Sequence, residues 1–289
     1  MNQIAVVDLS QATPHRLPTA TRAPMDFIRR QFGKPAFHSA ALTGGRMQFF
    51  FESESHTVPI DNMRAIAGTL SLDHEGFELL AHQTEVDDLN DDLAVEHVYL
   101  PEVEALLTRR FGASKVVAFD ATRRSDRDTG ANNPDGNRGP ATQVHVDYTA
   151  KSGPQRAADI LGKDEVARLT AGGARIVQVN VWRPIRGPVK RSHLALADVA
   201  SVEPDDLIAT DQIFPDRVGE IYMLAHAPSQ RWYYAPEMTK DEVLLIKGWD
   251  SLDDGRARFT PHGAFNPVEV DKNARPRESI EVRTFVVIE

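Results

Sequence analysis

The sequence predicts a mainly β protein with flanking helices, of the α+β class, whose strands close into a barrel or a sandwich. From residue 144 onward the chain consists of short apolar segments that are bounded by Gly, Pro, Asn or Asp. Many short strands with this punctuation are typical of barrels and sandwiches. With 289 residues and 41% apolar content, the chain can bury one large core, and all-β barrels of this size occur as single domains.

The first 45 residues contain Pro, Arg and Ala with weak periodicity. We expect residues 1–45 to form an extended N-terminal arm with one short helix around Pro24–Phe32, and residues 46–289 to form a single domain. The N-terminus lacks the basic and then apolar layout of a signal peptide. No run of about 18 apolar residues is present, so the expectation is a cytoplasmic protein that does not enter a membrane.

One helix of the first half has clear boundaries in the sequence. Pro101 suits the first helical position, Val103 and Leu106 follow at helical spacing, and Gly112 is a C-terminal stop. The expected elements of the first half are strands at Met47–Glu52, Gly76–His82 and Lys115–Phe119, a helix at Pro101–Phe111, and an ambiguous segment at Leu93–Leu100.

The stretch from Thr122 to Gln143 reads TRRSDRDTGANNPDGNRGPATQ and contains almost nothing to bury. It predicts a long loop at 122–143, and a loop of this length inside a compact domain is commonly functional. We expect its part from Thr122 to Gly139 to act as a lid.

The second half is expected to consist mainly of strands, with two short helices between Pro154 and Leu169. The expected strands are Val144–Thr149, Arg175–Trp182, Glu220–Ala225, Arg231–Tyr234, Glu242–Trp249, Arg256–Thr260 and Ser279–Ile288.

Composition excludes several kinds of site. The chain has no cysteine, which excludes disulfides, cysteine-ligated iron–sulfur clusters, zinc–thiolate sites and a cysteine nucleophile. Any metal is therefore expected to have nitrogen and oxygen ligands or, less plausibly, methionine sulfur. The net charge of -9 argues against a nucleic-acid partner, because phosphate binding requires a basic face.

A His-x-Asp pair follows the polar loop. His145 and Asp147 are two residues apart on an expected strand, so both side chains point to the same face. An imidazole and a carboxylate supply two ligands of the facial triad that binds non-haem iron(II) and leaves coordination positions open. The chain therefore has a candidate iron site, although a lone His-x-Asp is more often structural.

The third ligand is expected to be a histidine from a later strand. His193 lies beside Lys190 and Arg191 and is expected to be solvated, whereas His226 ends an apolar segment and could be a core residue. His262 lies at a junction between a strand and a turn. We favour His262, with His226 as the alternative.

An R-x-S pattern follows His262. Arg277 and Ser279 share a strand face, and a guanidinium with a neighbouring hydroxyl can bind the distal carboxylate of a 2-oxo acid. Arg283 has the same parity and is a rival anchor.

Weaker candidates for the lining of a substrate pocket are the aromatic residues Trp232, Tyr233 and Tyr234, with Trp182 and Trp249, because core packing explains them equally well. Arg123 and Arg124 could contact an acidic substrate, but we favour solvation for both.

A set of segments in order resembles the CmcJ/AsaB-like hydroxylase and desaturase family, from about residue 45 to the C-terminus. The segments are GFELLAHQTEV, FGASKVVAFDATRR, HVDYT followed by GPQRA, NVWRPI, QRWYYAPEMTKDEVLLIKGWDS, TPHGAF and PRESIEVR.

The resemblance implies a double-stranded β-helix (jelly-roll) core and an oxygenase that uses iron(II), 2-oxoglutarate and dioxygen to hydroxylate, desaturate or cyclise a small molecule. It implies His145, Asp147 and His262 as iron ligands, and Arg277 and Ser279 as contacts of 2-oxoglutarate. The alternatives are an iron oxidase that needs no 2-oxo acid, an inactive jelly-roll binding protein and, with least support, a hydrolase. A homodimer is the default expectation, since symmetric pairs are the commonest oligomers.

Overall fold

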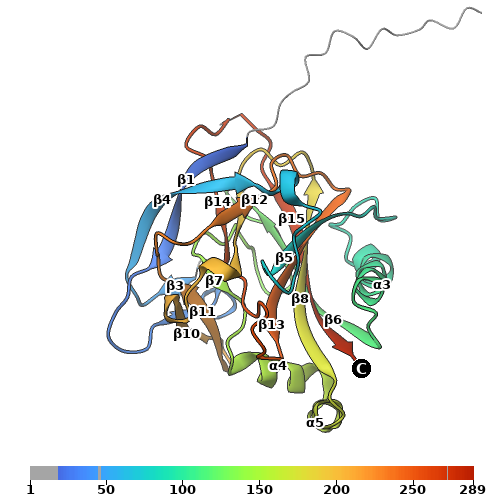
Figure 1. Ribbon diagram of the computed structural model, residues 1–289. Coiled ribbons are helices and arrows are strands. Elements are labelled where there is room, and N and C mark those ends of the chain that lie inside the picture. The colour runs from blue at the N-terminus through green and yellow to red at the C-terminus, as the bar shows by residue number, and fades with distance from the viewer. Residues whose placement is uncertain (1–18, 45–46, 272) are drawn as a thin grey trace, which may run out of the picture.

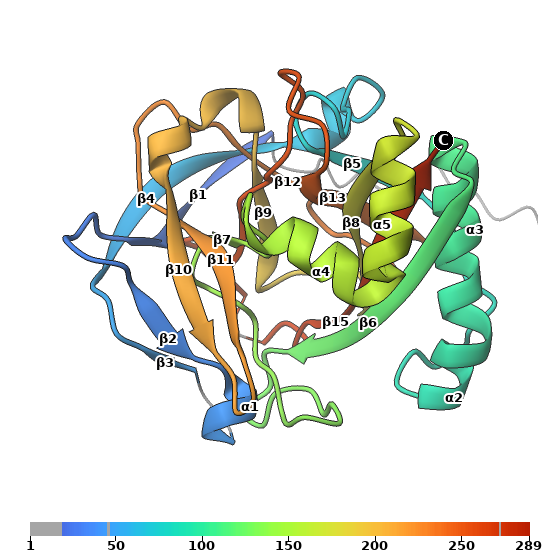
Figure 2. The same ribbon diagram turned by 90° about the horizontal axis from the view of Figure 1, so that it is seen from below.

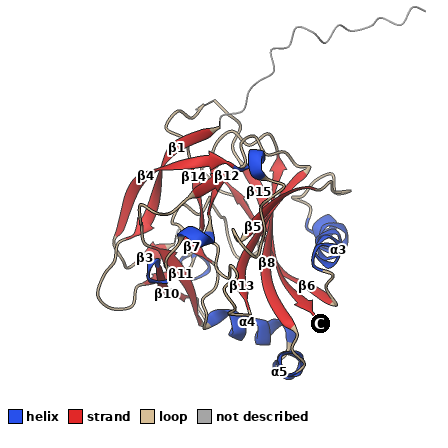
Figure 3. Ribbon diagram, in the orientation of Figure 1, coloured by secondary structure: helices blue, strands red, loops and turns tan. Residues whose placement is uncertain are grey.

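The computed structural model describes residues 19–44, 47–271 and 273–289 (Figure 1). The described chain is mainly β, with two curled sheets whose inner faces enclose a shared interior (Figure 3). The predicted fold class, a mainly β protein with flanking helices and a jelly-roll core, is confirmed.

The larger sheet has ten strands in the order β1-β4-β12-β9-β14-β7-β11-β10-β2-β3. Its strands are β1 (Ala20–Ile28), β2 (Ala36–His38), β3 (Gln48–Phe49), β4 (Ser53–Asn62), β7 (His145–Val146), β9 (His193–Ala197), β10 (Leu207–Ile213), β11 (Val218–Leu224), β12 (Trp232–Tyr234) and β14 (His262–Phe265).

The smaller sheet has five strands in the order β5-β13-β8-β15-β6. They are β5 (Phe77–Ala81), β6 (Lys115–Ser125), β8 (Arg175–Arg186), β13 (Glu242–Asp250) and β15 (Glu278–Ile288). The α-helices are α1 (Ala40–Thr43), α2 (Asp92–Ala94), α3 (Leu100–Phe111), α4 (Ser152–Leu161) and α5 (Lys163–Ala171). Short 3-10 turns at Met63–Ile66, Val199–Ser201 and Pro204–Asp206 and a π-helical turn at Val95–Tyr99 complete the described elements.

The two faces of the five-stranded sheet differ in chemistry. On its outer face, Val181 and Val282 pack with Val103 and Leu107 of α3 in one apolar cluster, and α3 covers this face in Figure 1. Alternate residues of β15 point the other way, so Arg283 and its same-face neighbours reach the interior between the sheets. Because side chains alternate along the strand, the inner face of this part of β15 is polar, whereas its outer face is apolar and packs against α3.

The N-terminal segment is part of the ten-stranded sheet. β1 pairs with β4 in antiparallel register, and Ala23, Met25 and Phe27 are buried. The expected arm is thus wrong for residues 20–43, and the helix expected around Pro24–Phe32 is mostly strand β1. Pro24 is tolerated because β1 lies at the sheet edge. Residues 1–18 and 45 of the expected arm lie outside the described residues.

Most of the other expected elements are present, including α4 and α5, which lie against the end of the sheets seen in Figure 2. β6 continues to Ser125, so the polar loop begins at residue 126 rather than 122. The segment Arg256–Thr260 is not a strand. Strands β2, β4, β9, β10 and β14 were not expected from the sequence.

His193 was expected to be solvated, but it begins β9 and is 7% exposed. Its ring packs against Tyr234 and Phe265. The expectation was wrong because the neighbouring Lys190 and Arg191 precede the strand and do not share its burial.

No helix of the described residues is long and apolar enough to cross a membrane.

We expect His193 to make folding stability depend on pH. Burial and then the charge of Arg277 lower its pKa from 6.5 to about 4. As the pH falls below 6.5, His193 therefore becomes protonated in the unfolded chain but stays neutral in the folded protein. The free energy of unfolding then decreases until about pH 4, where the folded protein is protonated too. The full effect is about 3 kcal/mol.

Chemical denaturation of the wild-type protein and of His193→Gln between pH 4 and 7.5 measures this contribution. The free energy of unfolding should fall less steeply with acid in His193→Gln. Equal slopes in the two proteins would show that His193 titrates alike in both states.

Candidate active site

Two neighbouring strands of the larger sheet bring the candidate ligands together. β14 pairs with β7 in antiparallel register, and His262 lies directly opposite His145. Asp147 follows β7 by one residue and faces the same side. One ligand atom from each of the three residues lies within 4.8 Å of the others, and His145 Nε2 is 3.6 Å from Asp147 Oδ1. The structure therefore brings together the three residues that the sequence predicts.

Backbone carbonyls orient both imidazoles. Nδ1 of His145 lies 2.8 Å from the carbonyl oxygen of Gln143, and Nδ1 of His262 lies 3.0 Å from that of Thr260. A carbonyl oxygen can only accept, so each Nδ1 carries the hydrogen and donates it. The lone pair is then on each Nε2, which is the arrangement that a metal-binding histidine requires.

Two side chains of the five-stranded sheet hold Asp147. Its Oδ2 accepts hydrogen bonds from Asn180 Nδ2 at 2.7 Å and from Arg283 Nε at 2.9 Å. Burial disfavours the charged carboxylate, but the charge of Arg283 and the hydrogen bond to His145 outweigh it and hold the pKa of Asp147 well below its usual range. With Oδ2 occupied, Oδ1 is the oxygen directed to the two histidines.

Burial, followed by the charge of His145, lowers the pKa of His262, so its imidazole is neutral near pH 7. An ionised carboxylate and imidazole nitrogen lone pairs form an N₂O donor set that suits a divalent transition metal. These residues therefore fit an iron(II) ion.

The other candidate histidines lie elsewhere. His226 stacks on His56 with ring centroids 3.8 Å apart. His193 packs among aromatic rings on the opposite face of β9 from Leu194. Neither joins the cluster.

A small cavity adjoins the cluster, and the buried guanidinium of Arg277 forms part of its lining. It is lined by His145, His262, Arg277 and six other residues, namely Arg124, Ala141, Trp182, Leu194, Ala264 and Glu281. Arg277 is 3% exposed, and its guanidinium carbon lies 5.7 Å from the centre of the Trp182 ring.

The guanidinium of Arg277 is only partly satisfied. Nη1 donates to Ser279 Oγ at 2.9 Å, while the buried Nε and Nη2 have no hydrogen-bond partner among the described residues. Burial and then the charge of Arg124 lower the pKa of Arg277 to about 10, so it stays protonated at neutral pH. A buried cation with two unused donors beside a hydroxyl is suited to a carboxylate.

Arg283, the rival anchor, is already paired. Besides Asp147, its guanidinium forms salt bridges of 2.6 Å to Asp120 and 2.7 Å to Glu281. These contacts favour a role in positioning Asp147, and they leave Arg277 as the better candidate for a carboxylate ligand.

The aromatic candidates do not line the cavity of the cluster. Trp232 and Tyr234 lie in an apolar core with Ala195 and Phe265. In the β12–β9 register, Tyr233 pairs with Leu196 and Trp232 with Ala197, so Trp232 points away from the face of His262. Trp232 and Tyr234 were expected to contact a substrate, but neither lines this cavity. The sequence does not reveal which face of β12 is turned inward. Trp182 lines the cavity instead.

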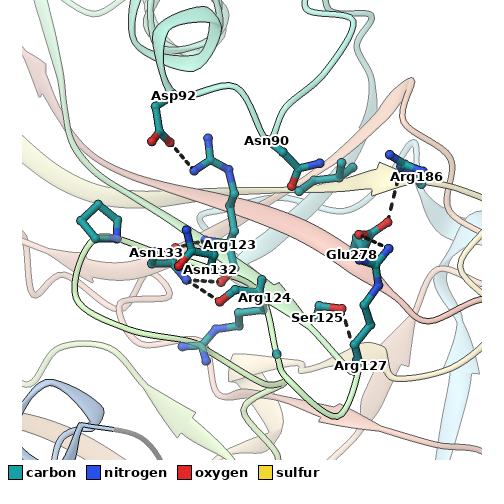
Figure 4. A pocket seen from close by; sticks show the side chains of 14 residues that line it. Asn90, Asp92, Arg123, Arg124, Ser125, Arg127, Asn132, Asn133, Arg186 and Glu278 are labelled. Carbon is teal, nitrogen blue, oxygen red and sulfur yellow. Dashed lines mark hydrogen bonds and ion pairs between the residues drawn. The ribbon is translucent and has the colours of Figure 1, made fainter.

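Arg123 lies in a second, larger cavity of about 640 Å³. Its Nη1 pairs with Asp92 at 2.6 Å, and nearby Glu278 pairs with Arg127 at 2.8 Å (Figure 4). Arg123 is opposite Ile280 of β15, a residue of the outer core. This cavity is therefore mainly on the helix side of the sheet, on the other face from the histidines.

The sequence reasoning missed Asn180, and it gave Trp182 and Arg124 only as weaker candidates. Asn180 and Trp182 belong to an expected strand and share a face, so parity offered a signal, but only the pairing of β8 with β15 shows that the face is turned inward.

Comparisons with known proteins agree with this geometry. A family model described as an oxidoreductase/YMDC permease-like domain matches residues 25–287. The chain is 36% identical over 253 residues to the hydroxylase/desaturase CTB9 of Cercospora beticola, which covers 81% of this chain and 76% of that protein. It is 31% identical over 250 residues to the Fe(II)/2-oxoglutarate-dependent dioxygenase nvfI of Aspergillus novofumigatus, covering 84% and 87% of the two chains.

A solved structure is similar over nearly the whole chain. The iron and alpha-ketoglutarate-dependent endoperoxidase NvfI superposes with a TM-score of 0.81 and 28% sequence identity, and the match covers 93% of this chain and 98% of that one.

Replacing His262 with Ala is expected to weaken iron(II) binding by about 100-fold or more, because one of three ligands is lost. His226→Ala is the matched control and should bind iron(II) as the wild type does. Anaerobic equilibrium dialysis with iron analysis measures both. Equal binding by the wild type and His262→Ala, or loss in His226→Ala, would contradict this ligand set.

Proposed function

This chain belongs to the hydroxylase/desaturase family that includes iron(II)/2-oxoglutarate-dependent dioxygenases, and we propose that His145, Asp147 and His262 hold the iron(II) in its active site. The chain is an oxidoreductase that uses iron(II), 2-oxoglutarate and dioxygen and acts on a small molecule. The assignment of the ligands rests on one observation: each of the three residues offers one ligand atom, and these atoms lie within 4.8 Å of one another.

When bound at these residues, iron(II) supplies the activation of dioxygen that couples decarboxylation of 2-oxoglutarate to oxidation of the substrate. The residues of the chain supply geometry. The carbonyls of Gln143 and Thr260 present the two Nε2 atoms, while Asn180 and Arg283 retain Oδ2 of Asp147 and so favour a single-oxygen bond to the metal. A three-residue set of this kind leaves coordination positions for the co-substrates.

Arg277 and Ser279 are the proposed contacts of the distal carboxylate of 2-oxoglutarate. The support is the buried guanidinium with two unused donors in the same cavity as His145 and His262. An unpaired buried cation is costly, and a carboxylate would both neutralise it and accept its hydrogen bonds.

The loop from 126 to 144 leads from β6 to the first ligand, and we keep its part up to Gly139 as the proposed lid. Ala131 and Arg138 form a bridge within it, and Asn133 bonds the backbone of Arg123. The first contact gives the loop internal structure, and the second attaches it to β6 beside the candidate site. A contact between Arg123 and the substrate, a homodimer and a cytoplasmic location also stay predictions.

Replacing Arg277 with Met is expected to weaken 2-oxoglutarate binding by about 10- to 100-fold, the effect of losing charge-assisted hydrogen bonds. Calorimetric titration of the manganese(II)-loaded protein, in which no turnover occurs, measures the dissociation constant. Metal binding itself should be unchanged.

Arg186→Met is the matched control, because Arg186 is opposite Glu278 at the same end of the sheet and pairs with it on the outer face. If Arg277→Met bound 2-oxoglutarate as tightly as the control does, the assignment of the anchor would be wrong.

A further inference from the structure

Arg124 is a second cation in the cavity of the proposed active site. It lies on β6 directly opposite Ser279 of β15, and its side chain lines the cavity with His145, His262 and Arg277. Arg123, Arg124 and Ser125 all line the larger cavity, but of these three only Arg124 also lines the cavity of the metal ligands. Strand alternation thus turns Arg124 alone of these three toward the metal ligands.

Arg124 has no carboxylate partner in the part of the chain that the structure describes. Its Nη1 donates to the carbonyl of Gly139 at 3.0 Å, and no described Asp or Glu oxygen lies within 4.0 Å of its guanidinium. The arginines around it differ in this respect. Arg123 pairs with Asp92, Arg127 with Glu278 and Arg283 with Asp147.

The arginines that face the interior differ in whether they have a carboxylate partner. The carboxylates of Asp147, Glu281 and Asp120 all pair with Arg283. Neither Arg124 nor Arg277 has an ion pair of this kind among the described residues, so a carboxylate that enters the cavity would supply the missing negative charge.

The position of Arg124 indicates which part of a dianion it would meet. Ser279 stands between the two arginines, since it is opposite Arg124 and accepts a hydrogen bond from Arg277. A carboxylate that bonds Arg277 and Ser279 therefore lies beside β6 as well. The metal ligands are on the other sheet, so this carboxylate is the one remote from the metal.

We propose that Arg124 is a second recognition residue for the distal carboxylate of the co-substrate, and that it selects 2-oxo dicarboxylates over 2-oxo monocarboxylates. This inference rests on the proposed function, because it assumes that 2-oxoglutarate occupies the cavity. Arg277 supplies the buried donors, and Arg124 adds charge and donors from the neighbouring strand β6.

The test compares two co-substrate analogues on manganese(II)-loaded protein by calorimetry. 2-Oxoglutarate carries the distal carboxylate, whereas 2-oxopentanoate has the same chain length without it. Arg124→Gln should bind 2-oxoglutarate about tenfold more weakly than the wild type and should bind 2-oxopentanoate unchanged. Arg124→Lys, which keeps the charge, should recover part of the loss.

Arg186→Gln is the matched control, since Arg186 lies outside the proposed lid and pairs with Glu278 on the outer face of the sheet. Unchanged binding of 2-oxoglutarate by Arg124→Gln would overturn the inference and leave the proposed function intact. An equal loss for both analogues would also overturn it, because Arg124 would then act on the end they share. No binding of 2-oxoglutarate by the wild type would instead refute the proposed function.

Discussion

The contact between Arg283 and Asp147 joins the two sheets across the interior, and the active site depends on it. Arg283 belongs to β15 of the smaller sheet, and Asp147 directly follows β7 of the larger one. A buried ion pair is expensive to desolvate, but removing one partner costs about 3 to 5 kcal/mol because the other charge is left alone. Asp120, Glu281 and Asn180 complete the network, so the carboxylate remains ionised and keeps one oxygen directed to the histidines.

The rest of the site follows from this arrangement. Arg283 pairs with three carboxylates, whereas Arg277 and Arg124, which line the same cavity, have no carboxylate partner among residues 19–44, 47–271 and 273–289. The interior is therefore built for anionic groups that the protein itself does not supply. Metal and co-substrate are then linked electrostatically, because each charge that enters changes the field experienced by the other.

The parts of the site that the sequence predicted are those defined by parity along one strand. His145 and Asp147 share a face, as do Arg277 and Ser279, and both pairs face the interior. His262 was favoured over His226 and the structure brings it to the cluster. The fold class was predictable because many short punctuated segments permit few architectures.

Other features required knowledge of which strands pair and which face turns inward. Trp232 and Tyr234 have the composition of a pocket but lie in the core, whereas Asn180 and Trp182 reach the interior. Arg123 and Arg124 are adjacent in sequence and both line the larger cavity, yet only Arg124 also lines the cavity of the metal ligands. The strand at Ala20–Ile28 was missed because Pro24 interrupts its alternating pattern. Only the antiparallel pairing with β4 shows that the segment is a strand.

The most direct test of the central claim is anaerobic addition of iron(II) and then 2-oxoglutarate to the purified protein, followed by visible absorption spectroscopy. If the three ligands hold iron(II) with open positions, a weak visible charge-transfer band should appear only after both have been added, and it should be absent from Asp147→Ala. Iron binding without a band in the wild type would contradict a site that chelates 2-oxoglutarate, and an undiminished band in Asp147→Ala would contradict the proposed ligands.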